Sequence, residues 1–420
     1  MCVLIAAMAL LLGSARAEAS GAQTGTITFS VERFTIGQGY FVEPVQIPIY
    51  AGDTSKDVLD RMLEPTGGYT QKEGSESFYV TALRNADSGT LDIPYYITDM
   101  SGYKITNDNN DGNAKYPDLG EFSYTEHSGW MYSVNGVFPN YGMDSYILKD
   151  GDVMRVQFTM WGTGADVGDP YNAGQYGLDI PNRDSLTKAI AAFNGRADKE
   201  ELLEVSFIAD AYSHAMETLE TIDPGITDQN DLDQAQAYLE SAIASKNLQA
   251  ITLDRDKLSL SYGGEDQLSV GYTPEDCRVD EGVKWTSSDR DCVYVEQDGR
   301  IYGDSIGTAI ITATLGNFTA SCEVTVSEES AEKPLQGISL NQTEVSLRKG
   351  KTTALKVSYN PADTTDDKTV TWSSDNEKTA TVDANGRITA VAKGEAVITA
   401  QVGSFTASCR VTVTEDDPVD

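Results

Sequence analysis

The sequence predicts a multidomain, mainly β protein with an α+β domain at its N-terminus, a short helical bundle and two tandem β-sandwiches. Three observations predict this class. A long segment of short strands is repeated in the C-terminal half, a segment with helical periodicity precedes it, and a strong hairpin signal lies in the N-terminal part. A chain of 420 residues is also too long for one hydrophobic core.

The charge of the chain excludes one class of partner. The sequence holds 31 Lys and Arg against 65 Asp and Glu, a net charge of −34. A field of that sign repels polyphosphate, so nucleic acid is not a predicted partner. The same charge keeps an exported protein soluble and apart from its own copies, and we therefore expect a monomer.

The N-terminal residues have the pattern of an export signal. An apolar run from Val3 to Leu12 is followed by Ala-Arg-Ala at 15–17, with small residues at the two positions that signal peptidase recognises. The run is too short to span a bilayer, and no later segment predicts a transmembrane helix. We therefore expect residues 1–19 to be a cleaved signal peptide. The protein would then be secreted, extracellular or held at the cell surface.

A repeat in the C-terminal half predicts the two β-sandwiches. NFTASCEVTV at 317–326 returns as SFTASCRVTV at 404–413, an offset of 87 residues (404 minus 317). Short alternating strands separated by turn signals are typical of two packed antiparallel sheets. The motifs Y-x-P, V-x-W-x-S, G-R-I and C-x-V-T-V resemble the bacterial immunoglobulin-like group 2 family over residues 248–327 and 335–415. That resemblance implies spacer or adhesion modules of exported bacterial proteins.

The cysteines of these sandwiches predict little covalent cross-linking, because their number is far below that of a disulfide-built domain. Cys322 and Cys409 alternate with valines on one strand face, which predicts buried thiols. Cys277 and Cys292 occur only in the first sandwich and form a candidate disulfide. The alternative is that these two also stay reduced.

Residues 184–246 predict a helical connector. Three runs in this segment have apolar residues at helical spacing, and a Pro-Gly break at 224–225 precedes the third. Asp198 and Glu201 have the spacing of a capping box at the start of the second run. We expect a small bundle with an apolar interior, packed independently of its neighbours as the other domains are.

Residues 24–165 predict a β-grasp-like domain, a sheet folded around one helix. Two strand-like runs precede an amphipathic helix with Thr54 or Ser55 as its N-cap. Asn135-Gly136 between apolar runs predicts a hairpin, because both central residues of such a turn need positive φ. The ending "VNG…LKDGDVMRV" is similar to ubiquitin-like proteins. "SGWMYSVNG", "NYGMDSYILKDGD" and "FTMWGTGAD" resemble more closely the exported bacterial domains related to the C-terminal domain of transcobalamin and intrinsic factor.

The transcobalamin-like resemblance implies a domain that binds a soluble ligand. In the vertebrate relatives this domain closes over a cobalamin that a separate helical barrel holds. The segment 184–246 has 63 residues (246 minus 184, plus one), which are too few to build such a barrel. The sequence therefore does not favour cobalamin as the ligand.

Aromatic residues near the hairpin form a candidate ligand site, which comprises Trp130, Tyr132, Asn135, Phe138 and Tyr141. Trp130 and Tyr132 share one strand face. If that face covers the helix, both rings are core, since large aromatics dominate small cores. If it is exposed, the rings can stack on a sugar or a corrin. The sequence leaves both interpretations open.

A polar insertion at 106–121 carries a calcium-loop pattern. Asn107, Asn109, Asp111 and Asp118 occupy its positions 1, 3, 5 and 12, with glycine at position 6. Asparagine at the first position and a short aspartate at the last depart from the pattern, and a solvated polar loop is the alternative. Calcium is therefore a candidate cofactor of the chain.

The sequence does not predict an enzyme. His127 and His214 lie in different predicted domains, and no nucleophile with a partner base or phosphate-binding loop accompanies them. We expect a secreted or cell-surface modular binding protein, whose β-grasp domain engages a soluble ligand, a glycan or a surface protein while the sandwiches act as spacers. Two alternatives remain. One is a structural stalk or adhesin with its contacts on the sandwiches, and the other is a cobalamin-binding protein.

Overall fold

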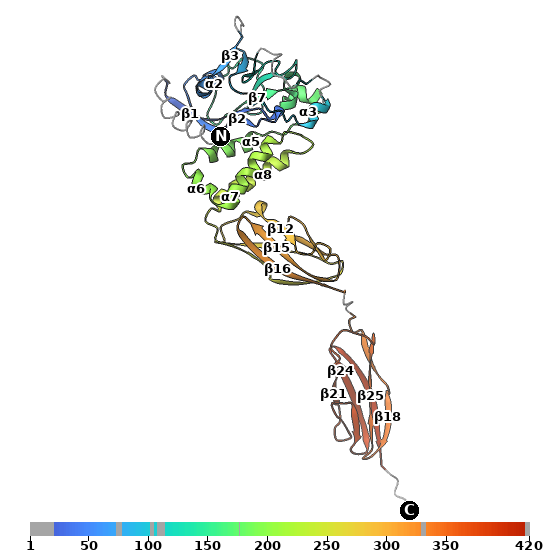
Figure 1. The fold of residues 1–420 in the computed structure, drawn as a ribbon. Helices are drawn as coiled ribbons and strands as arrows, with labels where there is room; N and C mark the ends of the chain where they lie inside the picture. The colour runs from blue at the N-terminus through green and yellow to red at the C-terminus, as the bar shows by residue number, and fades with distance from the viewer. Residues whose placement is uncertain are drawn as a thin grey trace, which may run out of the picture. The chain divides into compact units, whose positions relative to one another are not determined.

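The computed structural model describes residues 21–72, 78–100, 105–106, 114–175, 177–328 and 333–415. The described chain is mainly β and packs into two compact units, which divide between Val326 and Ser327 (Figure 1). The expected signal peptide, residues 1–19, lies outside the described residues. Within them, no helix is long and apolar enough to cross a membrane.

The N-terminal domain is built on a four-stranded mixed sheet. Its strand order is β2-β1-β7-β6, and the two central strands, β1 and β7, are parallel. Each edge strand is antiparallel to its neighbour. The strands are β1 (Gln23–Glu32), β2 (Tyr40–Tyr50), β6 (Gly129–Val134) and β7 (Val153–Thr159). This sheet, folded around one helix, confirms the predicted β-grasp-like architecture.

Helix α2 (Ser55–Leu63) covers one face of that sheet. Thr54 and Asp57 form a capping box at its start, so that Thr54 rather than Ser55 is the N-cap. Leu59 of the helix lies in the same core as Phe29 of β1. Shorter elements complete the domain, and they are β3 (Tyr69–Gln71), β4 (Val80–Leu83), α3 (Tyr95–Met100), β5 (Leu119–Gly120) and α4 (Pro170–Gln175).

The helical connector forms as predicted, although its second helix starts differently. Its helices are α5 (Asp184–Asn194), α6 (Lys199–Leu203), α7 (Ser206–Glu220) and α8 (Gln229–Ala244). The capping box expected at Asp198 is absent, because the Asp198 carboxylate accepts hydrogen bonds from Arg196 instead. A capping box does form at the start of α8, between Asp228 and Asp231.

The connector does not pack as a separate body. Its apolar side chains and those of the first sandwich form one continuous core, in which Phe207 and Tyr238 of the helices meet Val279 and Leu315 of the sandwich. Tyr40 of the β-grasp sheet packs against this core as well as its own. The expectation of independently packed domains is therefore wrong for the first unit, because the helices form one wall of the sandwich core.

The two sandwiches have equivalent sheets, with strand orders β12-β15-β16-β9 and β21-β24-β25-β18. Cys322 and Cys409 are fully buried free thiols, as predicted. The first sandwich contains β8 (Ala250–Leu253), β9 (Lys257–Ser261), β10 (Glu265–Gln267), β11 (Val270–Thr273), β12 (Lys284–Ser287), β13 (Val293–Val295), β14 (Arg300–Gly303), β15 (Gly307–Leu315) and β16 (Phe318–Ser327). The second contains β17 (Gly337–Leu340), β18 (Glu344–Arg348), β19 (Thr352–Ala354), β20 (Val357–Asn360), β21 (Thr371–Ser374), β22 (Ala380–Val382), β23 (Arg387–Ala390), β24 (Gly394–Val402) and β25 (Phe405–Thr414).

Cys277 and Cys292 do not form the candidate disulfide, since both are buried free thiols. Each sulfur faces a different carbonyl oxygen. The Cys277 thiol is directed at the carbonyl oxygen of Ser245, 3.9 Å away, at the end of the helical connector. The Cys292 thiol donates to the carbonyl oxygen of Ser305 at 3.3 Å.

The contact between the helices and the first sandwich can be tested at Gly282. A Cβ at this position would overlap the ring of Tyr238, so the ring or the sandwich would have to move. We expect Gly282→Ala to destabilise the first unit by about 1–3 kcal/mol, measured as a lower midpoint in thermal unfolding. Gly337→Ala is the matched control, because a Cβ there meets nothing within 4 Å. Equal effects of the two variants would contradict a tightly packed contact.

Candidate functional site

Strand β6 directs Trp130 and Tyr132 into the core, and both side chains are less than a tenth exposed. The Trp130 indole N–H donates to the carbonyl oxygen of Leu119 at 2.8 Å, and the ring packs edge-on against Phe158 with centroids 5.1 Å apart. The Tyr132 hydroxyl donates to the carbonyl oxygen of Tyr141 at 2.8 Å. Of the two interpretations of this strand face, the structure favours the core.

Asn135 shapes the hairpin between β6 and β7. It has a φ of 53° and Gly136 a φ of 72°, as the predicted tight turn requires. Its amide donates to the Asp152 carboxylate at 2.8 Å and accepts from the backbone N–H of Val153 at 2.9 Å. The side chain of Asn135 thus holds the start of β7 in place.

Tyr141 remains at the surface as part of an aromatic group. It is 50% exposed, and its ring stacks on Tyr146 with centroids 6.0 Å apart and an angle of 17° between the planes. Ile147, the next residue along the chain, is 53% exposed. We call Tyr141, Tyr146 and Ile147 the tyrosine patch. Phe138 is half-buried in the loop that precedes it.

Backbone hydrogen bonds hold the tyrosine patch against the start of α2. The N–H of Ser55 donates to the carbonyl oxygen of Tyr146 at 2.9 Å, and the N–H of Lys56 donates to that of Met143 at 3.0 Å. The first N–H groups of a helix have no partner within the helix, so these contacts satisfy two of them. The patch therefore rests on a rigid element rather than on an isolated loop.

The predicted calcium loop falls largely outside the described residues, which include neither Asn107, Asn109 nor Asp111. Asp118 is described, and its carboxylate accepts a hydrogen bond from the backbone N–H of Asn85 at 2.9 Å. Among the described residues, no group of three His, Cys, Asp or Glu side chains is arranged to hold a metal ion. Calcium binding at this insertion stays a prediction.

A second group of residues lies on the sheet face that points away from α2. Side chains alternate across a strand, and on this face β1 and β7 carry polar residues that are less than a tenth exposed: Thr28, Ser30, Glu32, Arg155, Gln157 and Thr159. Helix α5 lies against β1, β2 and β7 on this side (Figure 1). Sequence reasoning missed this burial, because polar alternation is also the pattern of a strand face in contact with water.

Arg155 is paired with two carboxylates beneath α5. It donates to the two carboxylate oxygens of Glu32, from Nε at 2.8 Å and from Nη2 at 2.7 Å, while its Nη1 lies 3.4 Å from Asp184. The Ser30 hydroxyl adds a third hydrogen bond to Glu32. Burial is the largest single effect and lowers the pKa of Arg155, but the charge of Glu32, its hydrogen bonds and the charge of Asp184 together raise the pKa above its ordinary value. Arg155 therefore stays ionised in the interior.

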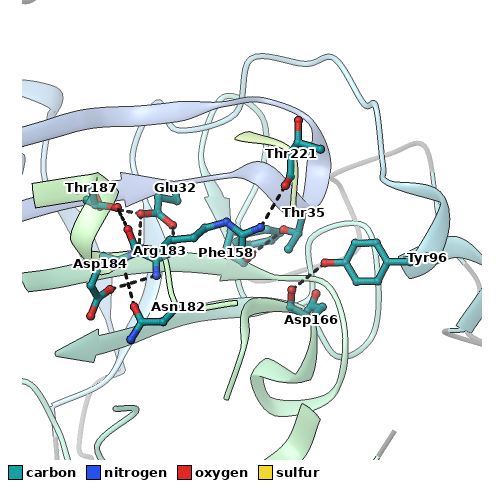
Figure 2. A network of polar contacts seen from close by, with 12 residues as sticks. Glu32, Thr35, Tyr96, Phe158, Asp166, Asn182, Arg183, Asp184, Thr187 and Thr221 are labelled. Atoms are coloured by element: carbon teal, nitrogen blue, oxygen red, sulfur yellow. Dashed lines mark hydrogen bonds and ion pairs between the residues drawn. The ribbon is translucent and has the colours of Figure 1, made fainter. Parts of the chain in front are cut away.

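Arg183 immediately precedes α5 and lies in the same polar network (Figure 2). Its Nη2 donates to the carbonyl oxygen of Thr221 at 3.1 Å, whereas its buried Nε has no hydrogen-bond partner. Burial, and then the positive charge of Arg155, lower the pKa of Arg183 to about 10. Its own carbonyl oxygen accepts from the Thr187 hydroxyl at 2.9 Å, which ties the residue to the first turn of the helix.

Asp166 lies in the turn after β7 and adds a further set of polar contacts to the network (Figure 2). Its carboxylate accepts hydrogen bonds from the Thr159 hydroxyl and from the N–H groups of Met160 and Trp161. Its backbone carbonyl oxygen accepts from the Tyr96 hydroxyl at 2.8 Å. Burial raises the pKa of the carboxyl to about 6, although these donors favour the ionised form.

A small cavity lies within this network, lined by Glu32, Thr35, Arg155, Gln157, Asp166 and Arg183 together with apolar side chains. It leaves about 10 Å³ for the centre of a water-sized molecule, which is room for about one water. No organic substrate fits this space. The network therefore acts by pairing charges in the buried layer between α5 and the sheet, and this pairing fastens the helix.

Replacing Arg155 tests whether its buried ion pair stabilises the fold more than an ion pair at the surface does. Arg155→Met leaves Glu32 buried without its cation, and we expect a loss of about 3–5 kcal/mol in the free energy of unfolding. Arg278→Met is the matched control, since its ion pair with Asp280 is exposed, and it should cost less than about 1 kcal/mol. Urea unfolding measures both. Similar losses would show that the buried pair does not hold the helix.

The pKa of Asp166 makes stability depend on pH. Its folded pKa of about 6 lies above the ordinary 3.8, so between these values the folded state binds more protons than the unfolded state. The stabilising contribution is complete below pH 3.8 and is lost as the pH rises through about 6. We expect Asp166→Asn, which mimics the protonated carboxyl, to equal the wild type in acid and to exceed its stability at neutral pH. Lower stability of the variant at neutral pH, in urea unfolding, would contradict the raised pKa.

Comparison with known families matches three segments of the chain. Residues 247–326 and 334–413 match the bacterial Ig-like domain (group 2). Residues 52–160, from the approach to α2 through β7, match a domain of unknown function, DUF4430. The predicted group 2 resemblance of the sandwiches is thereby confirmed. The resemblance of the N-terminal domain to transcobalamin stays a prediction.

Curated relatives share only parts of their length with this chain. An uncharacterized protein of Clostridium acetobutylicum is 34% identical over 171 residues, which are 39% of this chain and 17% of that protein. Ice-binding protein 1 of Shewanella frigidimarina is 30% identical over 174 residues, 40% of this chain and 19% of that protein. Lacto-N-biosidase of Bifidobacterium bifidum is 42% identical over 98 residues, 23% of this chain and 9% of that enzyme. The chain thus spans less than a fifth of each.

Solved structures with similar segments include an S-layer protein, rSbsC(31-844), with 21% identity, a TM-score of 0.21, and coverage of 41% of this chain and 29% of that one. Drosophila N-cadherin has 12% identity and a TM-score of 0.23, with 40% and 50% covered. TM-scores this low carry no inference about arrangement or role. The family matches therefore place a DUF4430 domain and two group 2 bacterial Ig-like domains on this chain.

Proposed function

We propose that this chain is a secreted or cell-surface binding protein, in which the β-grasp domain engages a soluble ligand or glycan and the Ig-like domains act as spacer or adhesion modules. The observation that carries the proposal is the tyrosine patch. It is a firmly held aromatic surface, exposed at Tyr141 and Ile147 and partly exposed at Tyr146, on a domain whose own core is already filled by other aromatic residues.

The tyrosine patch has the properties of a stacking surface. The rings of Tyr141 and Tyr146 are nearly parallel, and each phenol combines an apolar face with a polar edge. Ligand sites commonly join such apolar surfaces to a few polar groups that orient the ligand. Because α2 already holds the loop in place, little conformational freedom is lost on binding, which favours affinity.

The Ig-like domains support a spacer role. The second has its own core, which includes Leu355, Ile398 and Val411. The long hairpins of the two domains carry equivalent outward hydroxyl pairs: Thr312 with Ser321, and Thr399 with Ser408, each 3.1 Å apart. A filled interior and a solvated outer face suit a module that separates other domains and contacts surfaces only at its exterior.

The family matches and the net charge of the chain support a binding protein outside the cell rather than an enzyme. The matched families are Ig-like and DUF4430 domains, and lacto-N-biosidase shares only a short segment with this chain. The proposal therefore assigns no catalytic residue. A net charge of −34 suits an exported and soluble protein, and a soluble ligand, a glycan or a surface protein is the partner class that we propose.

A ligand screen followed by substitution tests the tyrosine patch. We expect a member of a panel of oligosaccharides and planar cyclic ligands to bind, and Tyr141→Ala to weaken that binding at least about tenfold, because removal of a central aromatic contact typically has such an effect. Isothermal titration calorimetry measures it. Tyr262→Ala, at a 61% exposed tyrosine of the first Ig-like domain, is the control. Unchanged binding by Tyr141→Ala, or an equal loss in the control, would place the ligand elsewhere.

A further inference from the structure

The chain contains three Asn-Gly pairs, at 135–136, 194–195 and 385–386. In such a pair the backbone nitrogen of the glycine can attack the side-chain carbonyl carbon of the asparagine, because the glycine has no Cβ that hinders the approach. The attack requires an asparagine side chain that is free to turn toward the following peptide group. The hydrogen bonds of each carboxamide therefore indicate which of the three pairs can react.

The structure holds two of the three carboxamides in place. Asn135 uses both ends of its carboxamide to hold the start of β7. Asn194 donates to the carbonyl oxygen of Pro44 at 2.8 Å, and its own oxygen accepts from Lys199 at 2.7 Å and from Tyr212 at 2.9 Å. Turning either side chain toward its glycine would break these hydrogen bonds at partly buried positions, which is unfavourable.

The third carboxamide, that of Asn385, is exposed in the turn between β22 and β23 of the second Ig-like domain. Within the part of the chain that the structure describes, no residue forms a hydrogen bond with this carboxamide. Gly386 has a φ of 75°, and its N–H donates to the carbonyl oxygen of Asp383 at 3.0 Å. The hydrogen bond of one short turn is therefore what restrains the attack at this pair.

The first Ig-like domain has an aspartate where the second has Asn385. The offset of 87 residues between the domains matches Asn385 to Asp298 (385 minus 87), and the glycine and arginine that follow are the same in both. The Asp298 carboxylate accepts from the N–H of Arg300 at 2.9 Å and lies 3.7 Å from its guanidinium. This turn therefore accommodates a carboxylate, and we expect one at position 385 to meet Arg387 in the same way.

We propose that Asn385 is a site of spontaneous deamidation. The nitrogen of Gly386 loses its proton to hydroxide and forms a bond to Cγ of Asn385. The bond from Cγ to Nδ2 then breaks, and Nδ2 takes up a proton from water and leaves as ammonia. Water opens the resulting succinimide ring at either carbonyl carbon, which gives aspartate or isoaspartate. The reaction needs only water and base, and it is independent of the tyrosine patch and of any ligand bound there.

The two products differ in their effect on the second Ig-like domain. Gly386 lies against Trp372, since an added Cβ would come within 2.6 Å of the indole, and its carbonyl oxygen accepts from the N–H of Leu355 at 2.9 Å. Aspartate leaves the backbone unchanged and keeps these contacts. Isoaspartate adds one carbon to the main chain directly before Gly386, so it displaces the glycine from a tightly packed position and destabilises the domain.

Incubation of the full chain in warm, mildly alkaline buffer, followed by peptide mapping with mass spectrometry, tests the proposal. We expect the peptide with Asn385 to gain the mass difference between an amide and a carboxyl group and to separate into two isomers. The peptides with Asn135 and Asn194 should react at least about tenfold more slowly, because each must first lose hydrogen bonds. Incubation in urea is the control, since unfolding frees all three side chains and should bring their rates together.

The stability of the products provides a second measurement. The isoaspartate form, separated by chromatography, should unfold with a midpoint on the order of 5 °C lower in the second Ig-like domain. The variant Asn385→Asp should unfold as the fresh wild type does, because the first domain has the same turn with Asp298.

Three results would overturn the proposal. The first is an Asn385 peptide that keeps its mass in the folded chain. The second is a rate at Asn135 or Asn194 equal to that at Asn385. The third is a preference for Asn385 that persists unchanged in urea, because the local sequence rather than the folded structure would then select the site.

Discussion

Burying charged side chains away from water has a large free-energy cost in this fold, and the ion pair between Arg155 and Glu32 offsets that cost. The sheet face that carries them would be solvated if the β-grasp domain stood alone. Helix α5 replaces the solvent, so each charge in the layer needs a partner within it. The position of Asp184 at the start of α5 is therefore coupled to the position of Arg155 on β7. Helices α7 and α8 pack with α5. The helices that line the core of the first Ig-like domain therefore depend on the ion pair between Arg155 and Glu32 as well.

Much of the architecture could be predicted from the sequence, because local patterns and repeats determine it. The Asn135-Gly136 turn, the N-cap at Thr54 and the inward-facing Cys322 and Cys409 each follow from neighbours a few residues away. The offset between the two Ig-like domains needed only comparison of the chain with itself. Such features depend on backbone conformation or on the alternation of side chains along a strand, and both are visible in a single stretch of residues.

The features that escaped prediction depend on segments distant in sequence. Thr28, Ser30 and Glu32 alternate with apolar residues in the manner of a strand with one wet face, and only the docking of α5 shows that protein covers them. A local exception is Asp198, which has the spacing of a capping residue but whose carboxylate accepts a hydrogen bond from Arg196, two residues earlier in the chain. The rings of Trp130 and Tyr132 could be assigned to core or surface only once their partners in distant loops were known.

The shared core between the helices and the first Ig-like domain has a consequence for how such chains evolve. The second Ig-like domain has a complete interior of its own, so recombination can add, remove or exchange it without exposing apolar surface. The first cannot be exchanged in that way, because a foreign copy would need a complement to Phe207 and Tyr238 on the helices. Lineages should therefore vary the number of domains after Val326 and inherit everything before it as one block.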